Sequence, residues 1–289
     1  MIDDPFVTHR SLLFTVAYEM LGSAADAEDV VQETWVRWNG VDQAEVREPR
    51  AYLVRIATRQ ALNRLRTQSR RREDYVGPWL PEPLVTTPDI ADDVVLAESV
   101  SMAMMLVVES LTPDERAVFV LREVFGFAHD EIAEAIGKSP AAVRQIGHRA
   151  RSHVQARRPR FQPDDAAATQ VVERFMTAAA TGDLQGLMDV LALDVVLLND
   201  GGGKVRAALR PVVSADKVAR LLVGLLSQFP TLTVRPAIIN GGRGALLFLD
   251  GALDTVATVH VDGDRIAAVY LTRNPDKVIA ASAARALRR

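Results

Sequence analysis

HDEIAEAIGKSPAAVRQIGH, residues 129–148, is the stretch that decides the fold of the middle of this chain. Ala133 is followed four residues later by Gly137, and Val143 comes six residues after that. A small residue lets two helices approach, a glycine permits the turn, and a branched apolar residue packs the second helix on the first. Ser139 and Pro140 are suited to the N-cap and the first helical position. The spacing predicts a helix-turn-helix.

The second helix of this motif carries polar and basic side chains on the faces that do not join the core. They are Arg144, Gln145, His148, Arg149, Arg151 and His153. Such a helix has the shape and charge to enter the major groove of DNA. The alternative is a helical hairpin with a solvated basic face.

Composition indicates separate modules in a globular protein. A length of 289 residues favours two or three domains, and 48% hydrophobic with 25% charged residues is typical of soluble globular chains. The net charge of −3 hides an uneven distribution: residues 47–73 hold nine arginines and two glutamates, whereas residues 89–98 hold four acids and no base. Such a pattern favours modules with different partners over a protein that coats nucleic acid along its whole length.

The chain has no cysteine, which excludes disulfides, thiolate nucleophiles and cysteine-ligated zinc. The five histidines show no metal-ligand spacing, so neither a metal nor another cofactor is expected. No signal region and no apolar run long enough to span a membrane is present. We therefore expect a cytoplasmic protein without a membrane partner.

Residues 6–73 read as helices. Apolar residues at helical intervals predict one helix over Ser11–Leu21, ended by Gly22. A second helix opens at Asp26 with an acidic outer side, and Trp35 and Trp38 lie in or near its apolar stripe. A long basic helix starts at Pro49.

Residues 74–100 break the helical pattern because four prolines fall between residues 78 and 88. This segment predicts an extended linker. Trp79, Leu80 and Leu84 are costly to leave in water, so we expect the linker to dock on a surface.

Residues 101–157 predict about four further helices, with Thr112 and Pro113 capping and starting one of them. Residues 164–289 change character. Helices are expected over residues 166–180 and 215–228, and strands over 195–199, 205–210, 232–240, 245–249, 255–261 and 265–272. Asp262-Gly263 is a hairpin signal. The expected fold is two all-α domains followed by an α+β roll with a curved antiparallel sheet.

Three segments, DAEDVVQETWVRW (26–38), PRAYLVRIATRQALNRLRTQSRR (49–71) and residues 111–151, resemble extracytoplasmic-function RNA polymerase sigma factors in order and separation. Residues 164–285 look like a SnoaL-like domain, a cone-shaped α+β fold. WLPEPL (79–84), DGGGK (200–204) and NPDK (274–277) are similar to marks of the sigma subgroup with this extra domain. The implied division is sigma region 2 over 1–73, a linker over 74–100, sigma region 4 over 101–160 and a regulatory domain over 164–289.

The resemblance implies a role for each helical segment. The second helix would dock on the β′ clamp of core polymerase through acidic and amide side chains: Asp26, Glu28, Asp29, Gln32 and Glu33. The long basic helix would handle the −10 element through Tyr52, Arg55, Arg59, Asn63 and Arg66, although Tyr52 is equally suited to the core. The second module would bind the β flap and read the −35 element through Ser139, Arg144, Gln145, His148, Arg149 and Arg151.

Two interpretations of the third domain compete. Catalysis would need a convergent acid–base pair, and Asp194, Asp200, Asp250, Asp254 and His260 form no recognisable dyad. The second interpretation is an in-chain regulator, because a tethered partner needs only weak intrinsic affinity. Its contacts would come from the three motifs: Trp79, Leu80, Pro81, Asp200, Gly201, Gly202, Gly203, Lys204, Asn274, Pro275, Asp276 and Lys277.

Trp79 would anchor that contact surface and Lys204 or Lys277 would supply its polar partners. A glycine-rich hairpin loop and a simple helix-starting turn are the alternatives for DGGGK and NPDK. The cone could also admit a small-molecule ligand. We expect a promoter-specificity subunit without enzymatic activity that binds core RNA polymerase and promoter DNA. The rival is a one-component regulator that binds duplex operators and senses a ligand.

Overall fold

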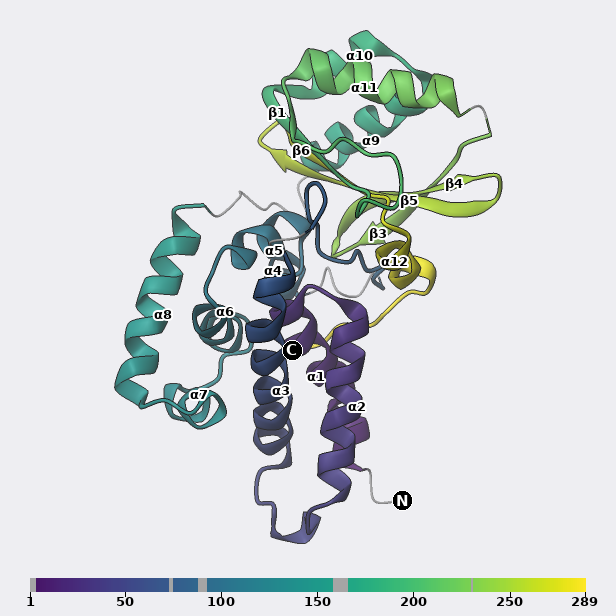
Figure 1. Ribbon diagram of the computed structural model, residues 1–289. Helices are drawn as coiled ribbons and strands as arrows, with labels where there is room; N and C mark the ends of the chain where they lie inside the picture. The colour runs from purple at the N-terminus through teal and green to yellow at the C-terminus, as the bar shows by residue number, and fades with distance from the viewer. Residues whose placement is uncertain (1–3, 73–74, 88–92, 158–165, 230) are drawn as a thin grey trace. The chain divides into compact units, whose positions relative to one another are not determined.

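The computed structural model describes residues 4–72, 75–87, 93–157, 166–229 and 231–289. The chain divides into two compact units (Figure 1). The helical unit comprises Met1–Asp74, Met104–Arg158 and Ala286–Arg289, and the mixed unit comprises Tyr75–Ala103 and Pro159–Arg285. The segment expected to be a linker therefore groups with the C-terminal part of the chain.

The helical unit begins with α1 (Pro5–Leu21), α2 (Ala24–Asn39), the short η1 (Gln43–Glu45) and α3 (Pro49–Arg72). Gly22 ends α1 in the left-handed conformation, as expected. The start of α2 was placed too late: Ser23 is its N-cap, because its hydroxyl accepts from the Asp26 amide. Trp38 is fully buried whereas Trp35 is 48% exposed, so only Trp38 belongs to the core.

The second half of the helical unit contains the helix-turn-helix. Its elements are α5 (Met102–Glu109), α6 (Pro113–Phe119), the π-helical turn η3 (Val120–Val124), α7 (His129–Ile136) and α8 (Pro140–Gln155). Gly137 takes the turn with φ 69°, and Ser139 accepts from the Ala142 amide at 3.2 Å. Val143 is fully buried. The predicted turn, cap and packing residue are confirmed.

The mixed unit contains α4 (Val94–Ser99), α9 (Ala166–Thr181), α10 (Leu184–Val190), α11 (Ala215–Gln228), α12 (Pro275–Val278) and η4 (Ile279–Ser282). Its strands are β1 (Leu191–Asp200), β2 (Val212–Val213), β3 (Thr233–Ile239), β4 (Gly242–Leu249), β5 (Ala252–Asp262) and β6 (Arg265–Thr272). They form one sheet in the order β2-β1-β6-β5-β4-β3.

Two expectations about this sheet are wrong. The strands β1 and β6 pair in parallel, because the chain leaves β1 and returns to its side only after α11 and the β3–β5 meander. Residues 205–210 form no strand, since the chain turns after Gly201 and pairs with β1 only at Val212–Val213. The remaining pairs are antiparallel, with register shifts in β4–β5 and β5–β6 that bend the sheet.

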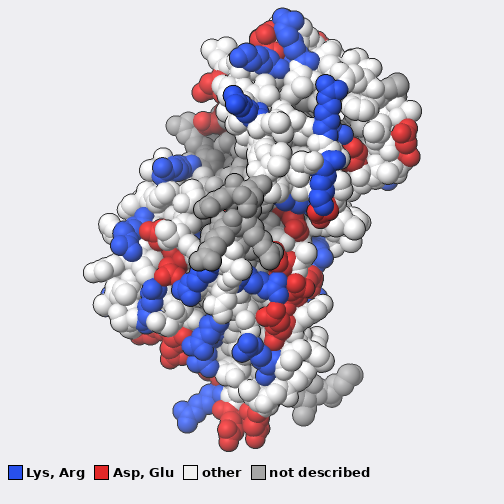
Figure 2. Space-filling view, viewed as in Figure 1, with Lys and Arg blue, Asp and Glu red and all other residues white. Residues whose placement is uncertain are grey.

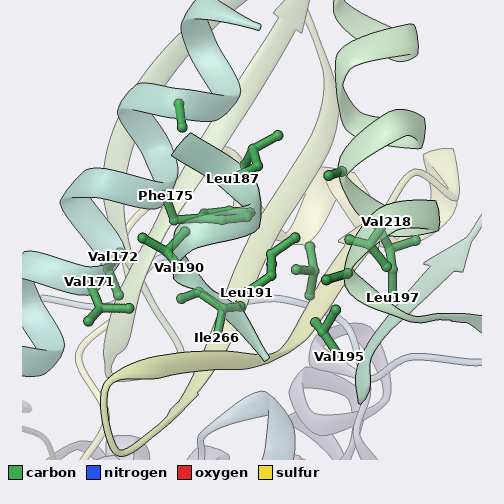
Figure 3. Packing of buried hydrophobic residues seen from close by; sticks show 14 of the residues in the cluster. Val171, Val172, Phe175, Leu187, Val190, Leu191, Val195, Leu197, Val218 and Ile266 are labelled. Carbon is green, nitrogen blue, oxygen red and sulfur yellow. The ribbon is translucent and has the colours of Figure 1, made fainter. Parts of the chain in front are cut away.

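Helices α9, α10 and α11 cover one face of the sheet (Figure 1). Figure 3 shows Phe175, Leu187 and Val190 from the helices pointing toward Leu197 and Ile266 of the strands. Burial of this apolar layer is the main stabilisation that the mixed unit has. A smaller cluster, formed by Ile239, Val256, Val278 and Ala281, includes Val85 from the linker segment.

Candidate nucleic-acid, polymerase and regulatory surfaces

The outer face of α8 is exposed, as a helix that reads DNA requires. Arg144, Gln145 and His148 are exposed, and Arg144 has no ion pair among those found in the described residues. Arg149 and Arg151 lie 3.7 Å from Glu115 and 2.6 Å from Glu123 respectively. These are surface pairs, which are worth about 0–1 kcal/mol and exchange easily for a phosphate. The Ser139 hydroxyl is engaged as the helix cap.

The basic helix α3 presents the residues expected to contact the −10 element. Asn63 and Arg66 are exposed, with Arg66 2.9 Å from Asp114. Tyr52 is half-buried: its ring centroid lies 6.0 Å from that of Trp38, and the Arg55 guanidinium lies 5.0 Å from the ring. Tyr52 therefore packs against the core while part of its side chain stays exposed.

Two arginines of α3 are engaged by the helix-turn-helix. Arg59 donates to the backbone carbonyls of Glu134 at 2.7 Å and Ala135 at 3.2 Å. These are carbonyls of the last turn of α7, which has no intrahelical donor for them, so the arginine caps the helix. Arg55 also lies 3.1 Å from the Glu134 carboxylate. Three of the groups expected to bind phosphates, Arg55, Arg59 and Arg66, thus have partners within the helical unit.

The acids of α2 converge on one arginine. Arg64 of α3 lies 3.1 Å from Asp26, 3.0 Å from Asp29 and 2.6 Å from Glu33. Burial alone would lower the pKa of Arg64, but the hydrogen bonds to Glu33 and Asp29 raise it above its ordinary value. Glu28 pairs with Arg10 at 2.7 Å. The arginine neutralises part of the acidic surface that the sequence indicates, and no local signal connects α3 with α2.

Exposed apolar side chains stand on the same helix as these acids. Trp35 is 48% and Val36 is 64% exposed, while Gln32 is exposed beside Glu33. A shallow hollow of the surface is lined by Gln32, Glu33, Val36 and Arg64, among others. Figure 2 shows acidic and basic side chains interspersed on the face in view rather than gathered in one field. Val36 is thus an exposed apolar residue among charged side chains of the hollow, whereas Trp35 is not one of the residues that line it.

Asp200 joins the linker to the sheet of the mixed unit. This carboxylate lies at the end of β1 and is fully buried. It accepts from the Tyr75 hydroxyl at 2.5 Å, the Leu80 amide at 2.9 Å and the Gly202 amide at 3.0 Å. The Lys277 ammonium lies 2.7 Å from the same carboxylate. A buried charge with four donors is a satisfied group rather than a poised acid or base.

Lys277 binds the linker from the other side. Its ammonium donates to the Leu80 carbonyl at 2.6 Å and lies 4.3 Å from the Trp79 ring centroid and 4.7 Å from that of Tyr75. Such ring contacts favour a desolvated cation. The first residue of the NPDK motif, Asn274, donates to the Tyr75 hydroxyl at 2.8 Å. Burial, followed by the hydrogen bond to Asp200, raises the pKa of Tyr75 well above its ordinary value.

The DGGGK loop needs its glycines because other chain segments approach them closely. Gly202 has φ 59°, and a Cβ there would overlap the Asn274 amide. A Cβ on Gly201 would lie 2.7 Å from the Val205 carbonyl oxygen. Lys204 and Asp276 form an ion pair in which both side chains are more than half exposed. The three motifs thus meet, with Lys277 at the buried centre and Lys204 at the rim.

The rest of the linker pairs with the edge of the sheet. Leu80 and Leu84 are fully buried. Leu84 donates to the Asn240 side chain at 2.9 Å, and its carbonyl accepts from the Asn240 amide at 2.8 Å. Val85 forms an antiparallel bridge with Ile239 at the end of β3. Asn240, which sequence reasoning did not single out, adopts φ 51° and also donates to the Val100 carbonyl at 2.8 Å.

The carboxylates weighed as catalytic groups do not converge. Asp194 and Asp250 are exposed, Asp200 is engaged by the linker, and Asp254 is paired with Arg273 at 2.9 Å. Burial lowers the pKa of His260, so its ring is neutral near pH 7. Among the described residues, no group of three or more potential side-chain ligands could hold a metal ion, and no helix is long and apolar enough to cross a membrane.

Comparison with known proteins identifies the whole arrangement. The model of sigma-70 region 2 matches residues 6–71, and that of sigma-70 region 4 matches residues 101–154. The ECF RNA polymerase sigma factor SigJ of Mycobacterium tuberculosis is 40% identical over 286 residues, covering 94% of this chain and 91% of that protein. The chain belongs to the ECF RNA polymerase sigma factors.

Other relatives agree with this assignment. The probable ECF sigma factor SigI of the same species is 30% identical, over 92% of this chain and 91% of its own length. The crystal structure of Mycobacterium tuberculosis SigJ superposes with a TM-score of 0.78 at 36% identity, covering 96% of this chain and 98% of that one. The match extends over the mixed unit, so the helical sigma regions with a C-terminal SnoaL-like α+β roll are confirmed.

In this sigma factor an unpredicted arginine joins sigma region 2 and sigma region 4. Arg116 of α6 is buried and donates twice to the Glu19 carbonyl near the end of α1, at 3.1 and 3.0 Å. Its guanidinium also lies 2.5 Å from Glu109. Burial lowers the pKa of Arg116 to about 10. Its position in the helical pattern marks it only as one more charged residue, so the sequence carries no signal for this contact.

Proposed function

We propose that this sigma factor recognises promoters through α3 and α8, docks on core polymerase through α2, and is regulated in the same chain by its mixed unit. The observation that carries the regulatory part is the burial of the linker. Leu80, Leu84 and the Leu80 amide are held by Asp200, Lys277 and Asn240 of the SnoaL-like part. A connector held this firmly constrains the region 4 helices that follow it.

The −35 element is the proposed target of α8. Exposed Arg144 and Gln145 carry the donors and acceptors that recognise guanine and adenine edges. Arg149 and Arg151 would exchange their exposed carboxylate partners for phosphates of the same groove. Region 4 would also contact the β flap of core polymerase.

The −10 element is the proposed target of α3, and the partners of three arginines of this helix support a form of the chain in which they compete with DNA. Arg55 and Arg59 bind α7, and Arg66 binds Asp114 at the start of α6. Melted promoter DNA offers phosphates and bases to the same side chains. We infer that core polymerase or promoter DNA must separate α3 from α7 before the −10 element is bound.

The proposed polymerase contact combines the acids of α2 with Val36, an exposed apolar residue of the same hollow. A β′ clamp surface rich in arginine would compete with Arg64 for Asp26, Asp29 and Glu33. Val36, which lines the same hollow as Asp29 and Glu33, would supply the apolar contact. Because such a sigma factor acts on polymerase and the chromosome, its place of action is the cytoplasm.

The mixed unit is proposed to bind rather than to catalyse. Asp200 and Asp254 are each bound to a cation and to hydrogen-bond donors. A general base needs a carboxylate that is free to accept a proton. A ligand taken up by this unit would therefore act as a signal.

Transcription with purified components tests the proposal. Core polymerase is mixed with the full chain and a broad set of genomic templates, and start sites are mapped. We expect start sites that require the chain and the acidic face of α2; the matched variants are Asp29→Arg at that face and Asp130→Arg on α7. The proposal is wrong if no start site depends on the chain, or if Asp29→Arg transcribes as well as Asp130→Arg.

A further inference from the structure

The mixed unit contains a partly open cavity that plays no part in its proposed binding of the linker. It lies between helices α9 and α11 and strands β3–β6, with a volume of about 100 Å³ open to the centres of water molecules. Most of its wall is aliphatic or aromatic, with Phe175, Met176, Leu222, Leu225, Leu247 and Leu271 among the lining residues. This volume exceeds what one water needs, and an apolar wall offers water few partners.

Three polar side chains interrupt the apolar wall: Asp254, Thr255 and Arg273. The Arg273 guanidinium donates twice to the Asp254 carboxylate, at 3.0 and 2.9 Å, and once to the Arg206 carbonyl at 2.8 Å. Thr255 donates to the same carboxylate. Burial would raise the pKa of Asp254, but the bonds from Arg273 and Thr255 hold it below its ordinary value. The pair is therefore charged on both sides and neutral in sum.

We propose that this cavity binds a neutral, mostly apolar small molecule that carries one hydroxyl or carbonyl group, held at the Asp254–Thr255–Arg273 corner. The apolar wall selects an alkyl chain or a fused aromatic ring. The polar corner orients it, because a hydroxyl can donate to the Asp254 carboxylate and a carbonyl can accept from Arg273.

A charged ligand is disfavoured by the same corner. The Asp254–Arg273 pair already cancels its own charge, with side chains 24% and 12% exposed. A carboxylate or an ammonium on the ligand would add an uncompensated charge beside an apolar wall, at a cost in desolvation. The cavity therefore selects neutral ligands, because the charges of Asp254 and Arg273 already compensate each other without a ligand.

The corner is connected to the linker through the backbone. The amides of Arg273 and its neighbour Asn274 both donate to the Asp200 carbonyl, at 2.7 and 2.8 Å. The Asp200 side chain holds the Leu80 amide, and Asn274 holds Tyr75. A ligand that moves Arg273 therefore acts on the residues that hold residues 75–80. This coupling rests on the proposed in-chain regulation.

The experiment measures binding of 2-naphthol, a neutral bicyclic probe with one hydroxyl, to the full chain by calorimetry at pH 7.5. The comparison probe is 2-naphthoate, which has the same ring and a carboxylate; 1-octanol is the aliphatic probe. We expect saturable binding of 2-naphthol, with 2-naphthoate at least tenfold weaker. Ala179→Phe, which fills the cavity from α9, should weaken 2-naphthol binding at least tenfold, whereas Ala167→Phe on an exposed position of the same helix should not.

Thr255→Val provides a second variant that keeps the side-chain shape, in case Ala179→Phe fails to fold by circular dichroism. Thr255→Val should weaken the binding of 2-naphthol. It should also weaken the binding of 1-octanol if the hydroxyl of that probe occupies the same corner. The proposal is overturned if neither neutral probe binds saturably, if 2-naphthoate binds as well as 2-naphthol, or if Ala179→Phe and Thr255→Val both leave binding unchanged.

Hydrogen exchange tests the connection without polymerase. Saturating 2-naphthol should change the exchange rate of amides in residues 75–87 at least twofold, and equal rates with and without probe would overturn the coupling. Binding and exchange are measured on the free chain, whereas the proposed function is tested by transcription. Failure of the ligand-binding proposal can therefore be distinguished from failure of the proposed function.

Discussion

At the scale of single residues, the mixed unit contains two lysine–aspartate pairs in opposite environments. Lys277 and Asp200 have side chains that are 8% and 0% exposed, whereas those of Lys204 and Asp276 are 53% and 64% exposed. Removing one member of a buried pair leaves an uncompensated charge and costs about 3–5 kcal/mol, while an exposed pair is worth about 0–1 kcal/mol. The motifs DGGGK and NPDK therefore contribute one structural lysine and one peripheral lysine.

Replacing Lys277 should undo the linker junction. Lys277→Met leaves the Asp200 carboxylate buried without its cation and the Leu80 carbonyl without its donor. We expect the unfolding midpoint of the mixed unit in scanning calorimetry to fall by an amount equivalent to about 3–5 kcal/mol, with faster amide exchange over residues 75–86. Lys204→Met is the control and should cost less than about 1 kcal/mol. Equal effects of the two variants would contradict the assignment.

Two glycines of the mixed unit, Gly202 in the DGGGK loop and Gly263 in the β5–β6 turn, have different surroundings. Gly202 and Gly263 have similar positive φ angles of 59° and 62°, but a Cβ meets the Asn274 amide at Gly202 and nothing within 4 Å at Gly263. Both alanine variants pay the left-handed strain, which is about 1–2 kcal/mol. Gly202→Ala should therefore destabilise the mixed unit by more than Gly263→Ala, in urea titrations of the full chain. Equal midpoints would show that the close approach is relieved without cost.

At the scale of elements, α7 competes with DNA for α3. The Arg55–Glu134 pair is exposed at 34% and 70%, so reversing the charge of Glu134 should leave the fold intact while repelling the arginine. We expect Glu134→Arg to raise the affinity of the free chain for a single-stranded −10 oligonucleotide several-fold, measured by fluorescence anisotropy. Asp130→Arg adds the same charge to an exposed position of α7. If the two variants gain equally, the increase is nonspecific attraction to phosphate.

The outer face of α8 gives a second prediction at this scale. Arg144→Ala should weaken recognition of the −35 element by about 1–3 kcal/mol if its guanidinium reads a base, and should relax sequence preference at one position. The readout is core-dependent transcription from templates that vary in the −35 element. Gln155→Ala, at the exposed C-terminal end of the same helix, is the control. A uniform, salt-sensitive loss would assign Arg144 to a phosphate instead.

At the scale of the whole molecule, the linker belongs to the compact unit that follows region 4 in the sequence. Deleting residues 164–289 should change transcription from the target promoter, because it removes the surface on which Leu80 and Leu84 are buried. Transcription with core polymerase is compared for the full and shortened chains over a range of salt and temperature. Identical amounts of transcript from the full and shortened chains in all conditions would contradict a regulatory role of the mixed unit.

The local signals of this sequence determined its helical parts. Gly22, Ser139 and Thr112 act at helix ends because capping needs only residues within one turn. The same holds for the helix-turn-helix, whose Ala133, Gly137 and Val143 lie close together in the sequence. Pairing of β1 with β6 was missed because strand order depends on the path of the chain between them, and periodicity within a strand does not report it.

The meeting of distant residues was decided only by the tertiary structure. The motifs WLPEPL, DGGGK and NPDK were recognised from the sequence by resemblance, but the residues that join them are 120 and 77 positions apart, and Asn240, Tyr75 and Arg116 carried no signal. The sequence indicates Arg55 and Arg59 as phosphate ligands, whereas in the structure both side chains bind Glu134 of α7. The residue type alone fixes which hydrogen bonds and ion pairs a side chain can form. Which partner it binds depends on which segments the folded chain brings within about 3 Å.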